Sequence, residues 1–202
     1  ASLIVNMVPV AMPFLLLLVI RERVTRAEIC GTVLGMSGVL LLGFGDFHLS
    51  REHAMGDAVC FFSMLFYAAY LIYARKNRDL PSIYLYVVPV YLMAGLMTLL
   101  GAGLLEFTGR NPQWIGPLTG REVVAILGLA LVPTVIGHSL INWALRVIRG
   151  QSVAILNLSQ FIFAGLLGFL ILEEVPPTVF YLASILVITG AIIVVRQKVV
   201  PA

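Results

Sequence analysis

The sequence predicts an all-α protein, a polytopic bundle of transmembrane helices, and three observations support this prediction. Of the 202 residues, 60% are hydrophobic and 11% are charged, with a mean hydropathy of +1.03. Soluble domains are typically about 45–50% apolar and about 25% charged, so both values point to a membrane protein. The apolar residues also form long stretches, and the charged residues gather in the short connections between them.

Seven stretches come close to the roughly 20 apolar residues that a helix needs to cross a membrane. Within lipid, the backbone polar groups must be satisfied internally, so we expect helices. The alternation that is typical of membrane barrel strands is not seen in the sequence. The predicted spans are 1–20, 28–45, 56–74, 83–105, 122–146, 152–172 and 177–195.

The basic residues separate by side if the seven helices alternate in direction. The connections after the first, third and fifth spans, with the C-terminal tail, hold ten Lys and Arg residues, and the opposite side holds three. Cytoplasmic loops are enriched in Lys and Arg, so the sequence predicts an external N-terminal end and a cytoplasmic C-terminus. The pI near 9.1 therefore reflects topology, and we expect no nucleic-acid partner.

The first and last pairs of spans resemble each other. At a constant offset of 151 positions, the matching residues are Asn6 and Asn157, Glu22 and Glu173, and Val24 and Val175. Gly38 and Gly190 also correspond, but their offset is one residue longer than 151. The first pair turns at the basic RERVTR and the last at the acidic EEVPP, so the copies run in opposite directions. Inverted repeats of this kind are a recurrent transporter design, although any two apolar hairpins look alike.

The second span contains GTVLG, from Gly31 to Gly35, with the GxxxG spacing that lets helices approach closely. We interpret it as packing within the bundle rather than as a contact between two copies, which leaves a homodimer as the alternative. Glu22 and Glu173 lie at span ends, where we expect them to cap a connection or to pair with nearby arginines.

Polar side chains form stripes inside four adjacent spans. Thr134, His138 and Asn142 follow each other at intervals of four, with Trp143 beside them. Buried polar groups in a membrane usually face the bundle interior or a wet cavity. The predicted substrate-binding residues are His138, Asn142, Trp143, Thr134, Asn157, Gln160, Tyr67, Tyr70, Tyr91 and Asn6. The alternative for each residue is a hydrogen bond that joins neighbouring helices.

His138 is the strongest single candidate, because an imidazole titrates near physiological pH and can couple transport to protons. Pro133 and Gly137 lie just before it and Pro89 lies in the fourth span, and broken helices often frame transporter sites. The lysines, arginines, aspartates and glutamates all lie outside the middle of the spans.

Enzymatic chemistry is not expected. The sequence GFGD at 43–46 superficially matches intramembrane aspartyl proteases, but its nearest second carboxylate, Asp57, lies at a helix start. Motifs of metalloproteases and serine hydrolases are absent from the sequence. The two cysteines, Cys30 and Cys60, lack zinc or redox spacing, so we expect no cofactor and no metal. A structural or assembly membrane protein is the rival interpretation.

Four stretches, read together, resemble the EamA branch of the drug/metabolite transporter superfamily. They are PVAMPFLLLLVIRERVT, LILEEVPP, GDAVCFFSMLFYAAYLIYARK and PTVIGHSLINWALRVI. Members of this family have ten helices in two inverted five-helix repeats, so the resemblance implies that the seven spans are helices four to ten. Residues 1–45 would then end the first repeat and 56–197 would form the second.

The resemblance also implies a function. It predicts a secondary-active transporter, an exporter of small metabolites or amino acid-like solutes, in the bacterial plasma membrane, with the bilayer and a small-molecule substrate as its partners. We expect the first three helices, roughly 80–100 residues at about 20 per span, to precede Ala1. Pro9 matches the family proline of the first repeat, but Gln160 stands at the equivalent position of the second, which departs from the family pattern.

Overall fold

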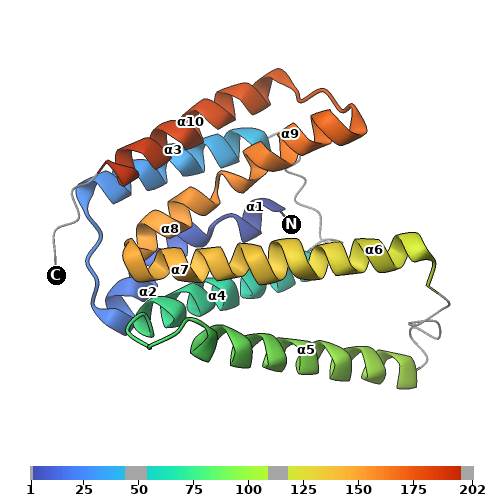
Figure 1. The fold of residues 1–202 in the computed structure, drawn as a ribbon. Helices are drawn as coiled ribbons and strands as arrows, with labels where there is room; N and C mark the ends of the chain where they lie inside the picture. Colours follow the sequence, from blue (N-terminus) through green and yellow to red (C-terminus); the bar gives the residue numbers. More distant parts are fainter. Residues whose placement is uncertain (1, 44–53, 109–117, 197–202) are drawn as a thin grey trace. The chain divides into compact units, whose positions relative to one another are not determined.

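The structure is a computed structural model that describes residues 2–43, 54–108 and 118–196. All regular elements in these ranges are helices, in agreement with the predicted fold class. In chain order they are α1 (Ser2–Val5), α2 (Val8–Ile20), α3 (Arg26–Gly43), α4 (Ala54–Lys76), α5 (Tyr84–Phe107), α6 (Gly120–Leu129), the π-helical η3 (Ala130–Gly137), α7 (His138–Val147), α8 (Gly150–Asn157), α9 (Gln160–Leu172) and α10 (Thr178–Val195) (Figure 1).

Seven helical stretches in the described part of the chain are long and apolar enough to span a membrane. They confirm the seven predicted spans, with ends that differ by a few residues. The stretches are Leu3–Ile20, Arg26–Gly43, Met55–Lys76, Tyr84–Leu105, Gly120–Val147, Gly150–Leu172 and Thr178–Val195. Hydrocarbon thickness sets this length, which explains why hydropathy predicts it well.

The helices fall into two compact units. The first unit comprises Ala1–Lys76 and Val147–Ala202, and so contains α1 to α4 and α8 to α10. The second unit comprises Asn77–Arg146, which contains α5, α6, η3 and most of α7.

The first span is broken between α1 and α2. Pro9 has no backbone N–H, so the carbonyl of Val5 loses the donor that an unbroken helix supplies four residues on. The Met7 N–H bonds instead to the carbonyl of Ile4 at 3.1 Å, in a tighter turn. Asn6 lies in this turn.

The sixth span is also broken, between α8 and α9, but without a proline. The Ser159 hydroxyl donates to the carbonyl of Leu156 at 2.6 Å, and the backbone N–H of Ser159 bonds to the same carbonyl at 3.0 Å. Serine side chains that bond to the backbone in this way compete with the regular helical ladder. The hydropathy of the span gives no sign of the break.

The first and last helix pairs have matching lengths. The helices α2 and α9 each have 13 residues, and α3 and α10 each have 18. Their starts differ by 152 positions in both cases, from Val8 to Gln160 and from Arg26 to Thr178. The structural offset is therefore 152 rather than the 151 expected from the sequence. It brings Gly38 and Gly190 into register, and displaces Asn6 from Asn157 by one residue.

Both pairs also turn in the same way. The C-cap residues Arg21 (φ 57°) and Glu173 (φ 58°) adopt the left-handed conformation, and their N–H groups bond to the carbonyls of Leu16 and Gly168. This ending satisfies carbonyls that the helix leaves free, at a conformational cost for a residue with a side chain. Glu173 ends α9 as its C-cap residue through its backbone N–H, and a role for its carboxylate stays a prediction.

Helices α3 and α10 pack side by side through backbone contacts (Figure 1). A Cβ atom added to Gly38 would lie 2.7 Å from the carbonyl oxygen of Ala183, and one added to Gly190 would lie 2.7 Å from that of Gly31. A Cβ on Gly35 would lie 2.8 Å from the Leu158 side chain. The prediction that the GTVLG glycines pack within the bundle is confirmed.

Candidate functional site

The two broken spans of the first unit meet through polar side chains. The Gln160 side-chain amide donates to the Asn6 carbonyl oxygen at 2.9 Å. Asn6 lies in the break between α1 and α2, and Gln160 begins α9 directly after the break of the sixth span. Both predicted site residues therefore lie where the helical backbone is interrupted inside a span.

A second polar contact in the first unit joins α4 to α8. The Asn157 amide donates to the Tyr67 hydroxyl at 3.4 Å, and Tyr67 stacks on Tyr70 with ring centroids 6.0 Å apart. Asn157 is the last residue of α8, on the other side of the same break as Gln160. Amides and phenol groups are thus gathered around the break of the sixth span.

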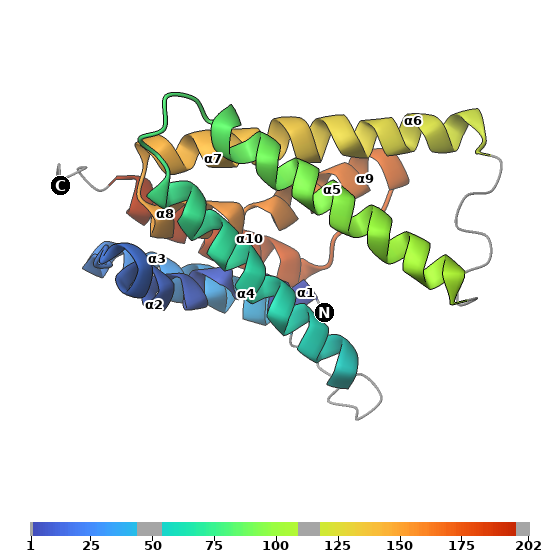
Figure 2. The same ribbon diagram turned by 90° about the horizontal axis from the view of Figure 1, so that it is seen from below.

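In the second unit, the fifth span runs through α6, η3 and α7 without interruption (Figure 2). Pro133 cannot donate to the carbonyl of Leu129, and the Thr134 hydroxyl donates to that carbonyl instead, at 3.1 Å. The His138 N–H bonds to the carbonyl of Pro133, five residues back. Single π-helical turns are rare and occur frequently at functional sites.

The π-helical turn is contacted by α5. The Tyr91 hydroxyl donates to the Thr134 carbonyl at 2.9 Å, which brings two predicted site residues together. One turn later, the Asn142 amide donates to the His138 carbonyl at 2.7 Å. Trp143, the fifth predicted residue of this unit, is 56% exposed.

Each unit therefore holds five of the ten predicted site residues. Asn6, Tyr67, Tyr70, Asn157 and Gln160 belong to the first unit, and Tyr91, Thr134, His138, Asn142 and Trp143 belong to the second. Several of them hydrogen-bond to one another or to helix backbone. Such contacts fit the alternative in which these residues join neighbouring helices. That the ten line a single cavity stays a prediction.

Gln151, on α8, replaces a backbone hydrogen bond that α2 lacks. Pro13 has no N–H to give to the carbonyl of Pro9, four residues back. The fully buried Gln151 amide donates to that carbonyl at 2.8 Å and to the Thr32 hydroxyl at 2.7 Å. A cavity of about 280 Å³ adjoins these groups, lined by Pro9, Val10, Pro13, Val24, Ile29, Thr32, Val33 and Met36. Thr32 is the one side chain of this lining with a polar group, so we do not assign the substrate site to it.

We expect Gln151→Leu to lower the free energy of unfolding by about 1–3 kcal/mol, because the carbonyl of Pro9 then stays buried without a donor. In a Pro13→Ala background, residue 13 regains its N–H and can bond to that carbonyl. The cost of Gln151→Leu should therefore be smaller there, and a double-mutant cycle of thermal unfolding in detergent measures the difference. Strictly additive costs would contradict this coupling.

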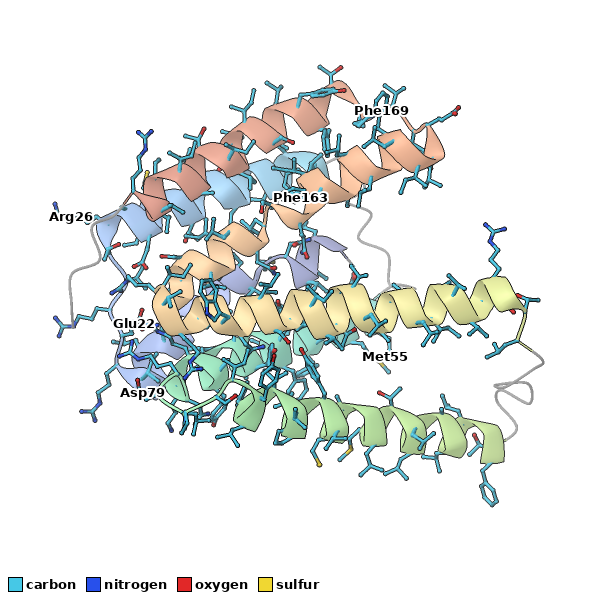
Figure 3. The ribbon with its side chains drawn as sticks, viewed as in Figure 1. Glu22, Arg26, Met55, Asp79, Phe163 and Phe169 are labelled. Atoms are coloured by element: carbon cyan, nitrogen blue, oxygen red, sulfur yellow. The ribbon has the colours of Figure 1, made fainter. Side chains whose placement is uncertain are left out.

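Four charged side chains form a cluster in the first unit, at the C-terminal ends of α2 and α4 and at the starts of α3 and α8. The members of this paired-charge cluster are Glu22, Glu28, Arg75 and Arg149. Glu22 contacts Arg75 at 3.2 Å and Arg149 at 3.6 Å, and the Arg149 Nε donates to Glu28 at 2.7 Å. Figure 3 labels Glu22 just after α2 and Arg26 at the start of α3. The expected pairing of Glu22 with arginines is confirmed.

Glu28 is the most buried member of the cluster, with 0% exposure. Its Oε1 accepts from Arg149 and, at 3.3 Å, from the Ser152 hydroxyl, and its Oε2 accepts from the Thr25 N–H at 2.8 Å. The Thr25 hydroxyl accepts in turn from the Glu28 N–H at 3.2 Å. This reciprocal pattern is a capping box that begins α3.

The protonation of Arg149 is fixed by its partners. Burial lowers the pKa of its guanidinium, but the hydrogen bond and charge of Glu28, with the charge of Glu22, outweigh burial and raise the pKa overall. Arg149 therefore stays charged at any physiological pH. Its guanidinium also donates to the carbonyl of Arg23.

From the sequence, the pairing of Glu22 was expected, but the rest of this cluster and Gln151 were missed. The sequence interpretation treated the arginines as a topology signal and gave Glu28 no role. The spacing of Thr25 and Glu28 before an apolar stretch is a recognisable capping signal, so the start of α3 was open to prediction. The partner Arg149 lies 121 positions away, and no local pattern predicts that contact.

Other sequence-level candidates add no site. Among the described residues, no group of three or more His, Cys, Asp and Glu side chains gathers in a way that suits a metal ion. The GFGD sequence lies, apart from Gly43, outside the described residues. Asp57 lies in the first turn of α4, as expected.

Comparisons with known proteins give one family and one informative fold. Residues 54–196 match the profile of the EamA-like transporter family. A protein of known crystal structure is similar in fold, with a TM-score of 0.81 and 18% sequence identity over 98% of this chain and 67% of the other. No curated protein matches the sequence.

Proposed function

Because the chain belongs to the EamA-like transporter family, within the drug/metabolite transporter superfamily, we propose that it is a secondary-active transporter that exports small metabolites or amino acid-like solutes. One observation carries the proposal beyond family membership. Two spans of the first unit are interrupted, and the polar residues Asn6 and Gln160 bond to each other at the interruptions. Discontinuous helices form the substrate sites of many secondary transporters.

The proposed mechanism is alternating access between two inverted repeats. The first repeat would end in residues 1–45 and the second would comprise 56–197. The equal helix lengths and the shared offset of 152 positions support this division. The basic connection after α2 and the acidic connection after α9 support opposite orientations in the membrane. Transport then follows from rocking of the repeats about the site.

The proposed site consists of the ten residues named above. Their amides, hydroxyls, aromatic rings and one imidazole suit small solutes with both polar and apolar parts. The π-helical turn before His138 supports a role for the fifth span. His138 is the residue for which we propose proton coupling, because imidazole changes its charge near physiological pH.

The proposed location is the bacterial plasma membrane, with the C-terminus in the cytoplasm. The ten-to-three division of Lys and Arg supports this orientation. The bilayer and the transported solute are the proposed partners. A homodimer stays a prediction, since the GTVLG glycines are used within the chain.

Replacing His138 or Asn142 by alanine tests the proposed site. We expect solute flux to fall about tenfold or more, the effect of losing one hydrogen bond to a bound solute. The measurement is efflux of a radiolabelled amino-acid mixture from proteoliposomes, with and without an imposed proton gradient. Leu140→Ala is the matched control, because this α7 side chain is 60% exposed and apolar, and it should leave flux unchanged.

The outcomes test the proposed site and the proposed function separately. Unchanged flux in both variants, at equal reconstitution, would remove His138 and Asn142 from the site. Undetectable flux in the unsubstituted protein under every gradient would count against a transporter. It would favour the alternative of a structural membrane protein.

A further inference from the structure

The paired-charge cluster joins segments that are far apart in the sequence. Glu22 and Glu28 flank the connection between α2 and α3, Arg75 ends α4 and Arg149 precedes α8. All four residues belong to the first unit, at the span ends that carry most of the basic residues. In the proposed repeat arrangement, the Glu residues belong to one repeat and the Arg residues to the other.

The cluster is balanced in charge, and its most buried carboxylate, Glu28, is saturated in hydrogen bonds, whereas the Glu22 Oε1 has only the 3.6 Å ion contact with Arg149. The cluster contains two carboxylates and two guanidiniums, and both oxygens of Glu28 accept hydrogen bonds from named donors. Saturation of this kind makes the present arrangement a well-defined state, since a half-satisfied buried network is costly. A partial displacement of α8 from α3 would leave Glu28 buried and unpaired, which favours all-or-none opening.

The cluster is also reversible in a way that an apolar contact is not. It lies at the basic ends of the spans, and in this closed arrangement the side chains of Glu22 and Arg75 are only 14% and 8% exposed. If the segments separate completely, water hydrates the four charges. Hydration offsets most of the attraction that is lost, because the net gain from a buried ion pair is small.

The residues beneath the cluster close the space between α2 and α8. A Cβ added to Gly150 would lie 2.9 Å from Leu16 and 3.4 Å from Met12. The side chains of Leu16 and Met12 are both fully buried. In this structure, α2 and α8 are therefore in close contact at this end, first through charges and then through packed apolar groups.

We propose that the paired-charge cluster is the gate at the basic end of the transport path, and that Arg149 and Glu28 set the balance between its closed and open states. The proposal rests on the proposed function, because a gate requires a path. It adds residues outside the ten of the proposed site. The gate is closed in this structure, so opening it requires Arg149 to leave Glu28 and Glu22 together.

Thiol accessibility measures the opening directly. A single cysteine is introduced as Met12→Cys in a background where the free thiols Cys30 and Cys60 are replaced by alanine. Its reaction with a membrane-impermeant maleimide is followed in sealed vesicles of both orientations. We expect Arg149→Gln to raise the labelling rate from the basic side about tenfold, as expected when one charge-assisted hydrogen bond is lost. Labelling from the opposite side should not rise.

Two further variants distinguish gating from general damage. Arg149→Lys keeps the charge and should restore slow labelling in part. Arg75→Gln removes the contact with Glu22 but keeps the pair of Arg149 with Glu28, and should give a smaller increase. It also serves as the test if Arg149→Gln does not fold. Arg78→Gln is the matched control, because its contact with Asp79 is exposed at the same end of the spans, and it should label like the parent.

The results decide the proposal separately from the proposed function. Equal labelling of the Arg149→Gln and Arg78→Gln proteins, or faster labelling of Arg149→Gln from both sides alike, would overturn the gate. If labelling rises from the basic side but the parent protein moves no amino acid, the gate stands as a conformational switch and the transport proposal fails. If amino-acid transport is measured but the labelling rate does not change, the gate proposal fails and the transport proposal stands.

Discussion

Replacing Glu28 by alanine is expected to lower the free energy of unfolding by about 3–5 kcal/mol, the cost typical of removing one partner from a buried ion pair. Glu28 is fully buried and accepts from Arg149, Ser152 and the Thr25 N–H. Its removal leaves the Arg149 guanidinium with the weaker contact to Glu22 and the carbonyl of Arg23, and it also removes the capping box of α3. Denaturant unfolding in mild detergent measures the loss.

Glu174→Ala is the control for this experiment. Glu174 is exposed, and surface substitutions usually change stability by less than about 0.5 kcal/mol. A double-mutant cycle with Arg149→Ala isolates the pair itself, and the two costs should be far from additive. A Glu28→Ala cost below about 1 kcal/mol would mean that the carboxylate is hydrated, contrary to its position here.

The second large effect is expected at the contact between α3 and α10. Gly190→Val should lower the free energy of unfolding by about 1–3 kcal/mol or more, because the added Cβ would lie 2.7 Å from the carbonyl oxygen of Gly31 and overpacking forces the backbones apart. For a chain of this length, each kcal/mol corresponds to roughly 2–4 °C in Tm. Thermal unfolding followed by circular dichroism measures the shift.

Gly101→Ala supplies the matched control. Gly101 lies inside α5, and an added Cβ meets no atom within 4 Å. Alanine is the better helix former by roughly 0.5–1 kcal/mol, so Tm should stay equal or rise. If Gly190→Val and Gly101→Ala behave alike, the close approach of α3 and α10 would be refuted.

The seven spans were predictable because hydrocarbon thickness fixes the length of an apolar helix, and the lipid forbids most alternatives. The kink sites were only partly predictable. Pro9 and Pro133 predict missing backbone hydrogen bonds in their helices. The break at Ser159, in contrast, arises from a side-chain hydrogen bond within an otherwise apolar stretch. Hydropathy does not register such a bond.

The residue types of the candidate site were predictable from the sequence, but the hydrogen-bond partners of these residues were less so. The amide and aromatic side chains inside the spans were identified from the sequence. However, the contacts of Gln160 with Asn6 and of Asn157 with Tyr67 join different spans, and a polar stripe on one span does not predict which other span lies beside it. Glu28 and Gln151 were missed for the same reason. Each is explained by a partner more than 100 positions away, and such contacts follow from tertiary packing rather than from local pattern.

The backbone contact between α3 and α10 has a consequence for how the bundle moves. Where side chains separate two helices, the helices can shear past each other by changing rotamers. At Gly31, Gly38 and Gly190 a carbonyl oxygen of the opposite helix lies within 3 Å of where a Cβ would stand, so rotamer changes can absorb little sliding. Helices α3 and α10 must therefore travel together as one rigid body. Among the described residues, the two five-residue connections that lead into them, 21–25 and 173–177, are then where this pair can hinge.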